Sequence, residues 1–230
     1  MAWRLLIVND FELIIFDCDG VLVDSERIAN GVFSKILNEE YGLSLSLSDT
    51  VELFLGRSCS QCMEIVKAKL GCEPSETLEK RYQLEINTAL VNDVVAVKGI
   101  EEALEKISVP YCVASSGSYE KMHATLGKTK LISRFEDKLF STSDVKNGKP
   151  SPDIYLYAAK IMGGIPANRC LVIEDSPLGI RGAVAAGMVA FGYSSLVKKE
   201  RLIKAGAHHL FDDMSNLVHE ILSYEHETKL

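Results

Sequence analysis

FDCDGVLVDSE (residues 16–26) contains four acidic side chains within ten positions. The run LIIF that ends at residue 16 is typical of a strand buried on both faces, and Gly20 marks a turn. We therefore expect Asp17 and Asp19 at the carboxyl end of a buried strand, where open α/β sheets bind ligands. Two carboxylates this close repel each other unless a cation lies beside them, so the stretch indicates a site for a hard divalent metal ion. A solvated turn built on aspartate is the alternative interpretation of the isolated motif.

The pattern of hydrophobic residues outside this stretch divides the chain into two parts. Between about residues 27 and 92, apolar residues recur only at helical spacing. From residue 94 onward, helical patterns alternate with short apolar runs expected to be strands, at residues 111–115, 138–141, 170–174, 188–192 and 209–211. This alternation predicts an α/β fold, with a doubly wound, Rossmann-like parallel sheet that carries helices on both faces.

The all-helical part is inserted into the α/β part directly after its first strand. The predicted domains are an α/β core made of residues 1–24 and 95–230 and a helical cap domain made of residues 25–94. Both connections between the domains lie close to the acidic pair, so the cap can act as a lid over it. The hinge is expected at residues 24–26, and residues 1–11 are expected to be a loose extension.

Composition limits the classes of partner. The chain has 230 residues, 47% of them hydrophobic, and a net charge of −7, which is typical of an ordinary soluble globular protein. The negative charge argues against a nucleic-acid or membrane partner, because either would require a basic patch. No signal peptide or membrane span is evident, so a cytoplasmic location is expected. The oligomeric state cannot be read from the sequence, and a monomer is the default expectation.

The six cysteines do not form a recognisable framework. Cys18, Cys112 and Cys170 lie in or beside apolar strand-like runs, as small core residues do, which indicates a reducing compartment. Cys59 and Cys62 form a C-x-x-C pair, but neither a second pair nor a nearby histidine completes a zinc site. The strand that precedes a thioredoxin-like motif is also missing. Metal or redox use of this pair is therefore not expected.

Two later positions supply groups that suit an anion. The strand at residues 111–115 ends at Ser115, and Ser116 and Gly117 continue a small, hydroxyl-rich turn that leads into a helix. The N-terminus of a helix favours an anionic oxygen, although such turns are often only helix caps. Lys149 precedes a proline, which favours an extended backbone and a side chain that projects from a loop. A solubilising surface charge is the alternative interpretation of this lysine.

A second acidic pair follows a later strand. Glu174 and Asp175 lie at the end of the predicted strand at residues 170–174. Beside Asp17 and Asp19 this pair would be strongly unfavourable without a counter-charge. It therefore strengthens the prediction of a metal site.

These four motifs, taken in order, resemble the haloacid dehalogenase superfamily of phosphohydrolases. The motifs are DCDGVLVDSE (residues 17–26), Ser115, Lys149 and EDS (residues 174–176). The stretch GKPSPDIY (residues 148–155) and the helical insertion are similar to the subgroup with a cap after the first motif. The resemblance covers the chain after its first dozen residues and implies the sheet order of the superfamily.

The resemblance also implies an activity and roles for individual residues. It implies a Mg²⁺-dependent phosphohydrolase that acts on a small phosphorylated metabolite, such as a sugar phosphate. Asp17 would be the nucleophile that forms an aspartyl-phosphate, and Asp19 would be the general acid and base. Ser115 and Lys149 would hold the oxygens of the transferred phosphoryl group, and Ser116 and Gly117 would bind substrate. Mg²⁺ would be held by Asp17, the main-chain carbonyl of Asp19, Asp175, and Glu174 directly or through water.

Other activities within the superfamily are the main alternatives. Haloacid dehalogenases and phosphonatases depart from the D-x-D pattern, so Asp19 favours phosphoryl transfer. β-Phosphoglucomutases share the motifs but have a histidine in the first cap helix, where this chain has Ala29. A non-catalytic relative with a decayed site is disfavoured because no motif residue is missing.

Substrate selectivity is expected to lie in the cap. In the resembling enzymes an arginine near the position of Arg57 can reach a polar or anionic end of the substrate, whereas a surface charge or a helix cap is the alternative. The motif and the size of the cap are similar to sugar-phosphate phosphatases, among them enzymes for 6-phosphogluconate.

Overall fold

The computed structural model describes residues 10–57 and 59–227 of the chain. Most of the predicted N-terminal extension therefore lies outside the described residues. The core is a sheet of six parallel strands in the order β3-β2-β1-β4-β5-β6. The strands are β1 (Leu13–Phe16), β2 (Tyr111–Ser115), β3 (Leu139–Ser141), β4 (Cys170–Glu174), β5 (Val189–Tyr193) and β6 (His209–Phe211). The doubly wound parallel sheet expected from the sequence is confirmed.

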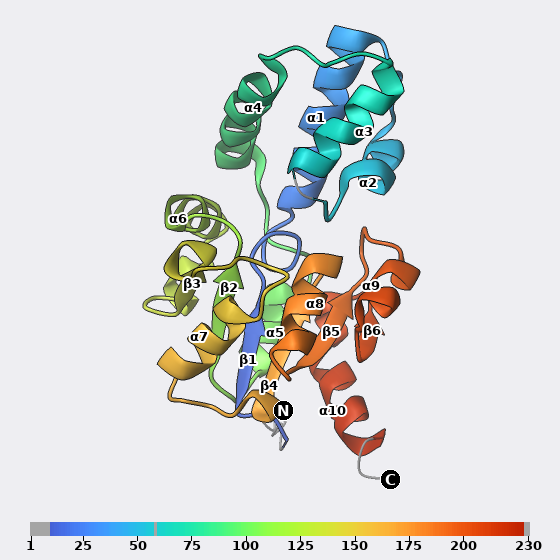
Figure 1. Cartoon of the computed structure of the whole chain (residues 1–230). Helices are drawn as coiled ribbons and strands as arrows, with labels where there is room; N and C mark the ends of the chain where they lie inside the picture. The colour runs from blue at the N-terminus through green and yellow to red at the C-terminus, as the bar shows by residue number, and fades with distance from the viewer. Residues whose placement is uncertain (1–9, 58, 228–230) are drawn as a thin grey trace.

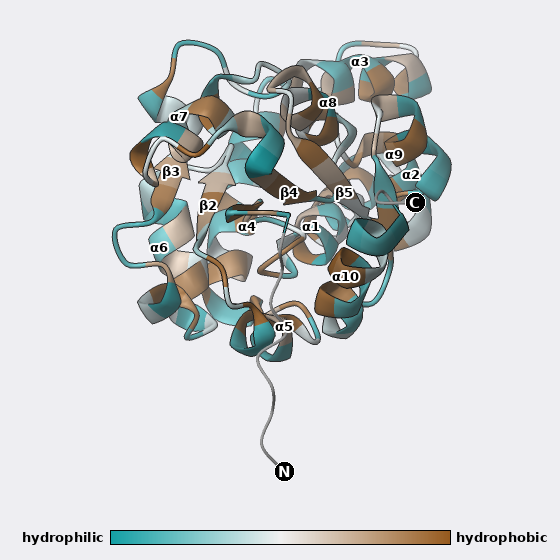
Figure 2. Cartoon of the chain, turned by 90° about the horizontal axis from the view of Figure 1, so that it is seen from below, coloured by the Kyte–Doolittle hydropathy of each residue, from teal (hydrophilic) through white to brown (hydrophobic). Residues whose placement is uncertain are grey.

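Strand β1 divides its side chains between two hydrophobic cores. All four of its residues are buried. Ile14 and Phe16 pack in one core and Leu13 and Ile15 in the other, as the alternation of side chains along a strand requires. The first core includes α5 (Ile100–Lys106), α6 (Tyr119–Lys128) and α10 (Leu217–Glu227), and the second includes α7 (Asp153–Ile161), α8 (Pro177–Ala185) and α9 (Lys199–Ala205). Figure 2 shows the apolar strands enclosed by these helices.

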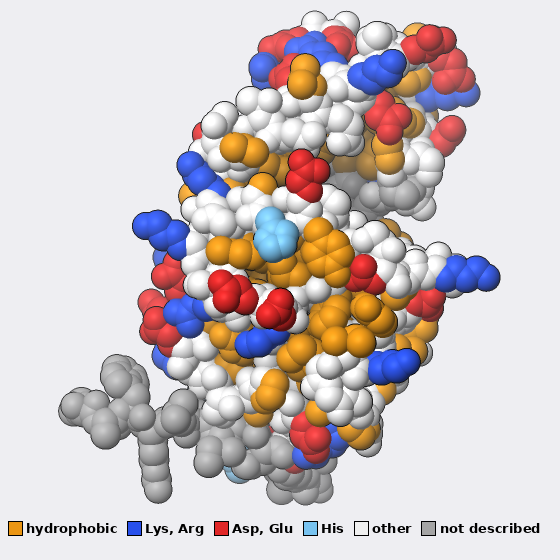
Figure 3. Space-filling view, turned by 90° about the vertical axis from the view of Figure 1, so that its left-hand side faces the viewer, with side chains coloured by type: hydrophobic (Ala, Val, Ile, Leu, Met, Phe, Trp, Pro, Cys, Tyr) orange, Lys and Arg blue, Asp and Glu red, His pale blue; other side chains and the backbone are white. Residues whose placement is uncertain are grey.

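The segment inserted after β1 contains helices with a core of their own. They are α1 (Ser25–Tyr41), α2 (Leu47–Phe54), α3 (Cys59–Leu70) and α4 (Leu78–Asp93), and we refer to them as the cap. Phe33, Leu37 and Val66 are among the side chains of a third, separate hydrophobic cluster between these helices. The cap lies over the carboxyl ends of the central strands (Figure 1), and the surface is indented between cap and core (Figure 3).

The two connections between cap and core run side by side. Val23 and Ala96 form an antiparallel bridge, and the Asp24 N–H donates to the carbonyl of Val95 at 2.9 Å. Asp24 therefore lies in the connection, while Ser25 already belongs to α1. None of the helices in the described part of the chain is long and apolar enough to cross a membrane.

Candidate active site

The carboxyl ends of β2, β1 and β4 bring the predicted site residues together. These strands are neighbours in the sheet and run parallel, so residues that follow them in the sequence meet at one edge. A pocket of ≈ 470 Å³ lies between this edge and the cap. Its lining includes Asp17, Asp19, Arg57, Ser115, Ser116, Gly117, Lys149 and Asp175. Glu174 lies behind the pocket wall and has no exposed surface.

A glycine at position 20 allows the close approach of the two acidic motifs. Gly20 has a φ of +77°, in the left-handed region that favours glycine. The carboxyl group of Asp175 occupies the space where a Cβ atom of residue 20 would lie. Any larger side chain would therefore push Asp175 away from Asp17.

Lys149 is buried and pairs with two carboxylates. Its Nζ lies 2.8 Å from Oδ1 of Asp17 and 2.6 Å from Oε1 of Glu174, and its side chain is 4% exposed. Tyr155 donates its hydroxyl to the same Glu174 oxygen at 2.9 Å, and Ser176 donates to the other oxygen. Burial acts to lower the pKa of Lys149, but Asp17 and Glu174 outweigh it and hold this pKa well above the usual range. The interpretation of Lys149 as a surface charge is therefore wrong.

Three buried carboxylates form what we call the acidic cluster: Asp17, Glu174 and Asp175. Each offers an oxygen, and these oxygens all lie within 4.8 Å of one another. Burial, opposed by Lys149 and reinforced by Glu174, raises the pKa of Asp17 to about 7. Burial and then Glu174 raise the pKa of Asp175 well above its usual value. Crowded carboxylate oxygens in a desolvated site fit a hard divalent cation, which would supply the missing positive charge.

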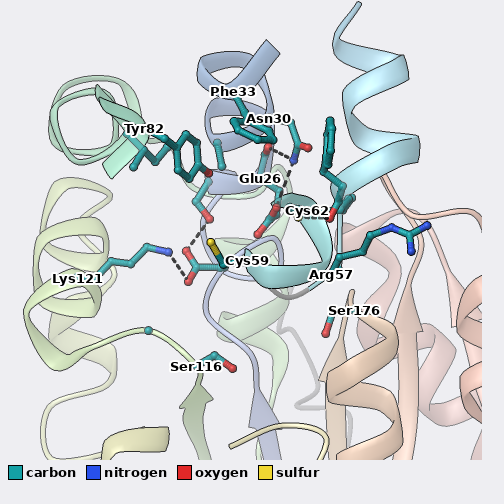
Figure 4. A pocket seen from close by; sticks show the side chains of 18 of the residues that line it. Glu26, Asn30, Phe33, Arg57, Cys59, Cys62, Tyr82, Ser116, Lys121 and Ser176 are labelled. Carbon is teal, nitrogen blue, oxygen red and sulfur yellow. Dashed lines mark hydrogen bonds and ion pairs between the residues drawn. The ribbon is translucent and has the colours of Figure 1, made fainter. Parts of the chain in front are cut away.

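The side chain of Asp19 is directed away from the acidic cluster. Its Oδ1 accepts a hydrogen bond from Ser25 Oγ at 2.6 Å, and its Oδ2 lies 2.8 Å from Nζ of Lys121 (Figure 4). The acidic cluster found among the described residues does not include it. Metal binding by the main-chain carbonyl of Asp19 stays a prediction.

The hydroxyl-rich turn after β2 has the expected form. Ser115 is 1% exposed, and its Oγ accepts the N–H of Gly117 at 3.0 Å. Ser118 then caps α6 by accepting the N–H of Lys121 at 3.2 Å. The turn therefore presents small side chains and backbone groups to the pocket, next to Asp19.

Arg57 lies in the loop between α2 and α3 and lines the pocket from the cap side. In Figure 4 its guanidinium points away from Lys121. Burial and then Arg57 lower the pKa of the neighbouring Arg201, whose Nη2 donates to the carbonyl of Leu55 at 2.7 Å. Contact of Arg57 with a substrate stays a prediction.

A family described as haloacid dehalogenase-like hydrolase matches residues 14–193 of the chain. The chain belongs to this family. A 6-phosphogluconate phosphatase of Escherichia coli is 33% identical over 185 residues, which cover 80% of this chain and 83% of the relative. The family resemblance read from the four motifs is thus confirmed, and so is the expectation of a phosphoric monoester hydrolase.

Solved structures of the haloacid dehalogenase-like family share the whole architecture. A family protein of Agrobacterium tumefaciens has a TM-score of 0.87 and 33% identity, covering 94% of this chain and 99% of that one. A Thermotoga maritima protein described as a β-phosphoglucomutase has a TM-score of 0.71 and 28% identity, covering 94% and 99%. The fold class is therefore confirmed.

Three charged residues that line the pocket, Lys121, Glu26 and Glu79, were not recognised in the sequence as part of the site. Lys121 lies in the first turn of α6, and no motif of the sequence includes it. Glu26 was assigned to the hinge, yet its carboxylate faces the pocket near Asn30, whose Nδ2 lies 3.4 Å away. Burial and then Asp19 raise the pKa of Glu26 to about 7. The acidic character of its motif was the one available signal.

The C-x-x-C pair also lines the pocket from α3. The thiol of Cys59 donates to Glu79 at 3.5 Å, and burial raises its pKa. Burial raises the pKa of Cys62 to about 11. Both thiols therefore stay protonated near neutral pH, which makes them poor nucleophiles.

Proposed function

We propose that this protein is a Mg²⁺-dependent phosphatase that hydrolyses a small phosphorylated metabolite, a sugar phosphate in particular, through an aspartyl-phosphate. The observation that supports this most directly is the position of Asp17. It lies at the end of the central strand, bonded to buried Lys149 and beside Asp175, at the floor of a pocket large enough for a sugar phosphate.

Asp17 and Asp19 divide the chemistry between them. An Asp17 carboxylate oxygen attacks phosphorus, the bond from phosphorus to the substrate oxygen breaks, and Asp19 gives that oxygen a proton. Asp19 then takes a proton from a water molecule, whose oxygen attacks phosphorus and displaces Asp17. The products are the alcohol and inorganic phosphate. Ser115 and Lys149 hold the phosphoryl oxygens during both steps.

The acidic cluster would hold Mg²⁺ through Asp17 and Asp175, together with the main-chain carbonyl of Asp19 and Glu174 directly or through water. The bound ion would offset the negative charge of the nucleophile and the phosphate. Lys149 already neutralises part of this charge through its two ion pairs. The name of the Escherichia coli relative makes phosphorylated sugars and sugar acids the first class to assay.

The test is phosphate release from p-nitrophenyl phosphate and from a panel of sugar and polyol phosphates, with Mg²⁺ and with EDTA. Asp17→Asn should lower the rate by at least about 10³-fold because it removes the nucleophile. Asp24→Asn is the matched control, since Asp24 belongs to the same motif but pairs with Arg27. Release that continues in EDTA, or in Asp17→Asn, would contradict the proposal.

A phosphosugar mutase is the second candidate, supported by the likeness to the Thermotoga maritima structure. Ala29, at the position where those mutases have a histidine, lines the pocket. The absence of this histidine favours hydrolysis over the mutase reaction. Conversion of glucose 1-phosphate into glucose 6-phosphate without release of phosphate would decide for the mutase.

A further inference from the structure

Lys121 is a second lysine at the carboxyl end of the sheet. It forms an ion pair with a carboxylate that Lys149 does not contact. Its Nζ lies 2.8 Å from Oδ2 of Asp19, while Lys149 contacts Asp17 and Glu174. The Lys121 side chain is 37% exposed, so its ammonium stands at the pocket wall. Each of the two aspartates of the D-x-D motif thus has its own cation.

The backbone around Lys121 places its side chain against Asp19. Lys121 lies in the first turn of α6, where its N–H is bonded to the Ser118 cap. A Cβ atom at Gly117 would lie 3.5 Å from both Asp19 Oδ2 and Lys121 Cδ. Because Gly117 has no side chain, the Lys121 side chain can extend past it to reach Asp19.

Asp19 is held from two sides that belong to different parts of the molecule. Lys121 of the core helix α6 binds Oδ2, and Ser25 at the start of the cap helix α1 donates to Oδ1 at 2.6 Å. With both oxygens bonded, the carboxylate has one orientation. Without Lys121, Glu26 and Asp17 would remain close to the Asp19 carboxylate, and Lys149, which is paired with Asp17 and Glu174, would be the lysine left nearby.

We propose that Lys121 is a positioning residue that fixes the Asp19 carboxylate on the leaving-group side of the pocket. The proposal rests on the proposed phosphatase function, in which Asp19 gives its proton to the departing oxygen. In the first step, a misdirected carboxylate slows only substrates whose leaving group needs that proton. The reaction of water in the second step is common to all substrates and, because it follows release of the alcohol, does not enter kcat/KM. An alkyl phosphate needs it, because an alkoxide is a poor leaving group, whereas p-nitrophenyl phosphate releases a stable phenolate.

The experiment compares kcat/KM for the best alkyl phosphate of the substrate panel with kcat/KM for p-nitrophenyl phosphate, in the same preparation. This ratio does not depend on how much of the protein is folded. Lys121→Met removes the charge but keeps most of the apolar length of the side chain. It should lower kcat/KM for the alkyl phosphate about 10–100-fold, but less than about 3-fold for the aryl phosphate. Lys121→Arg should recover part of the loss, because it restores the positive charge.

Lys128→Met is the matched control, since Lys128 is an exposed residue in the last turn of the same helix. It should leave both values unchanged. Equal losses for the two substrates in Lys121→Met, or no loss for the alkyl phosphate, would overturn the positioning role. If the wild-type protein hydrolysed neither the alkyl phosphate nor p-nitrophenyl phosphate, that result would instead overturn the proposed phosphatase function.

Discussion

Glu26 shows how strongly a single site residue can depend on its surroundings. It ends the first acidic motif, but its carboxylate is withdrawn into the pocket, where burial and then Asp19 raise its pKa from 4.5 to about 7. The folded protein therefore binds a proton at Glu26 more tightly than the unfolded chain does. Because the pKa of Glu26 is higher in the folded protein, the free energy of unfolding falls as pH rises from about 4.5 to 7. It stays at this lower value at higher pH.

Glu26→Gln should therefore stabilise the protein at pH 8 and leave it nearly unchanged at pH 4.5. One pKa unit corresponds to about 1.4 kcal/mol, and partial exposure reduces the effect, so we expect a gain on the order of 1–3 kcal/mol at pH 8. The measurement is the free energy of unfolding by urea at both pH values, in EDTA. Exposed Glu64→Gln on α3 is the control. A gain of the same size at both pH values would contradict the prediction.

Contacts between side chains distant in the sequence could not be predicted. Lys121 and Asp19 are 102 residues apart, and Lys149 and Asp17 are 132 residues apart. The motif order indicated that Lys149 belongs to the site, but its burial and its second partner, Glu174, depend on how β1 and β4 lie side by side. Lys121 has no local pattern at all, so only the folded structure reveals it.

At the scale of elements, short helices were missed while the strands were predicted well. Strand β1 lies at the expected position because a short apolar run followed by a turn signal is typical of a strand buried on both faces. Helices α2 and α9 were not predicted. They have 8 and 7 residues, so each offers only about two turns of apolar spacing to recognise. Helix α2 is instead specified by a capping box formed by Ser46 and Asp49.

Helix α8 must lie close to Glu174, and one glycine makes this possible. A Cβ atom at Gly179 would overlap the Glu174 carboxyl group, which holds Lys149. Gly179→Ala should therefore break this buried pair, lower the free energy of unfolding by about 2–5 kcal/mol, and reduce activity at least tenfold. Urea unfolding and phosphate release measure the two effects.

Gly31→Ala in α1 is the matched control for this substitution. A Cβ atom there meets nothing within 4 Å. Alanine should stabilise that helix by about 0.5–1 kcal/mol, because it restricts the unfolded chain and favours the helix. A loss of stability in Gly179→Ala no larger than the change in Gly31→Ala would contradict the tight contact of α8 with Glu174.

At the scale of the whole molecule, a metal ion bound at the acidic cluster would also affect stability. The chain carries a net charge of −7, and three of its carboxylates are crowded at one end of the sheet. Mg²⁺ at 100 times its dissociation constant should raise the free energy of unfolding by about 2.7 kcal/mol, and so raise Tm by several degrees. Asp175→Asn should lose most of this rise, and Asp24→Asn should keep it. Thermal unfolding with and without Mg²⁺ tests this independently of activity, and an unchanged Tm in the wild type would contradict it.

The sheet order also has a consequence for how the protein is made. Strand β1 leaves the ribosome first but pairs with β2 and β4, and β4 ends at residue 174. At about 5–20 residues per second, translation leaves this apolar strand without its final neighbour for roughly 10–30 s. The cap helices, whose hydrophobic cluster contains no strand residue, are translated before any partner strand. Nascent β1 is therefore the segment on which we expect chaperones to act.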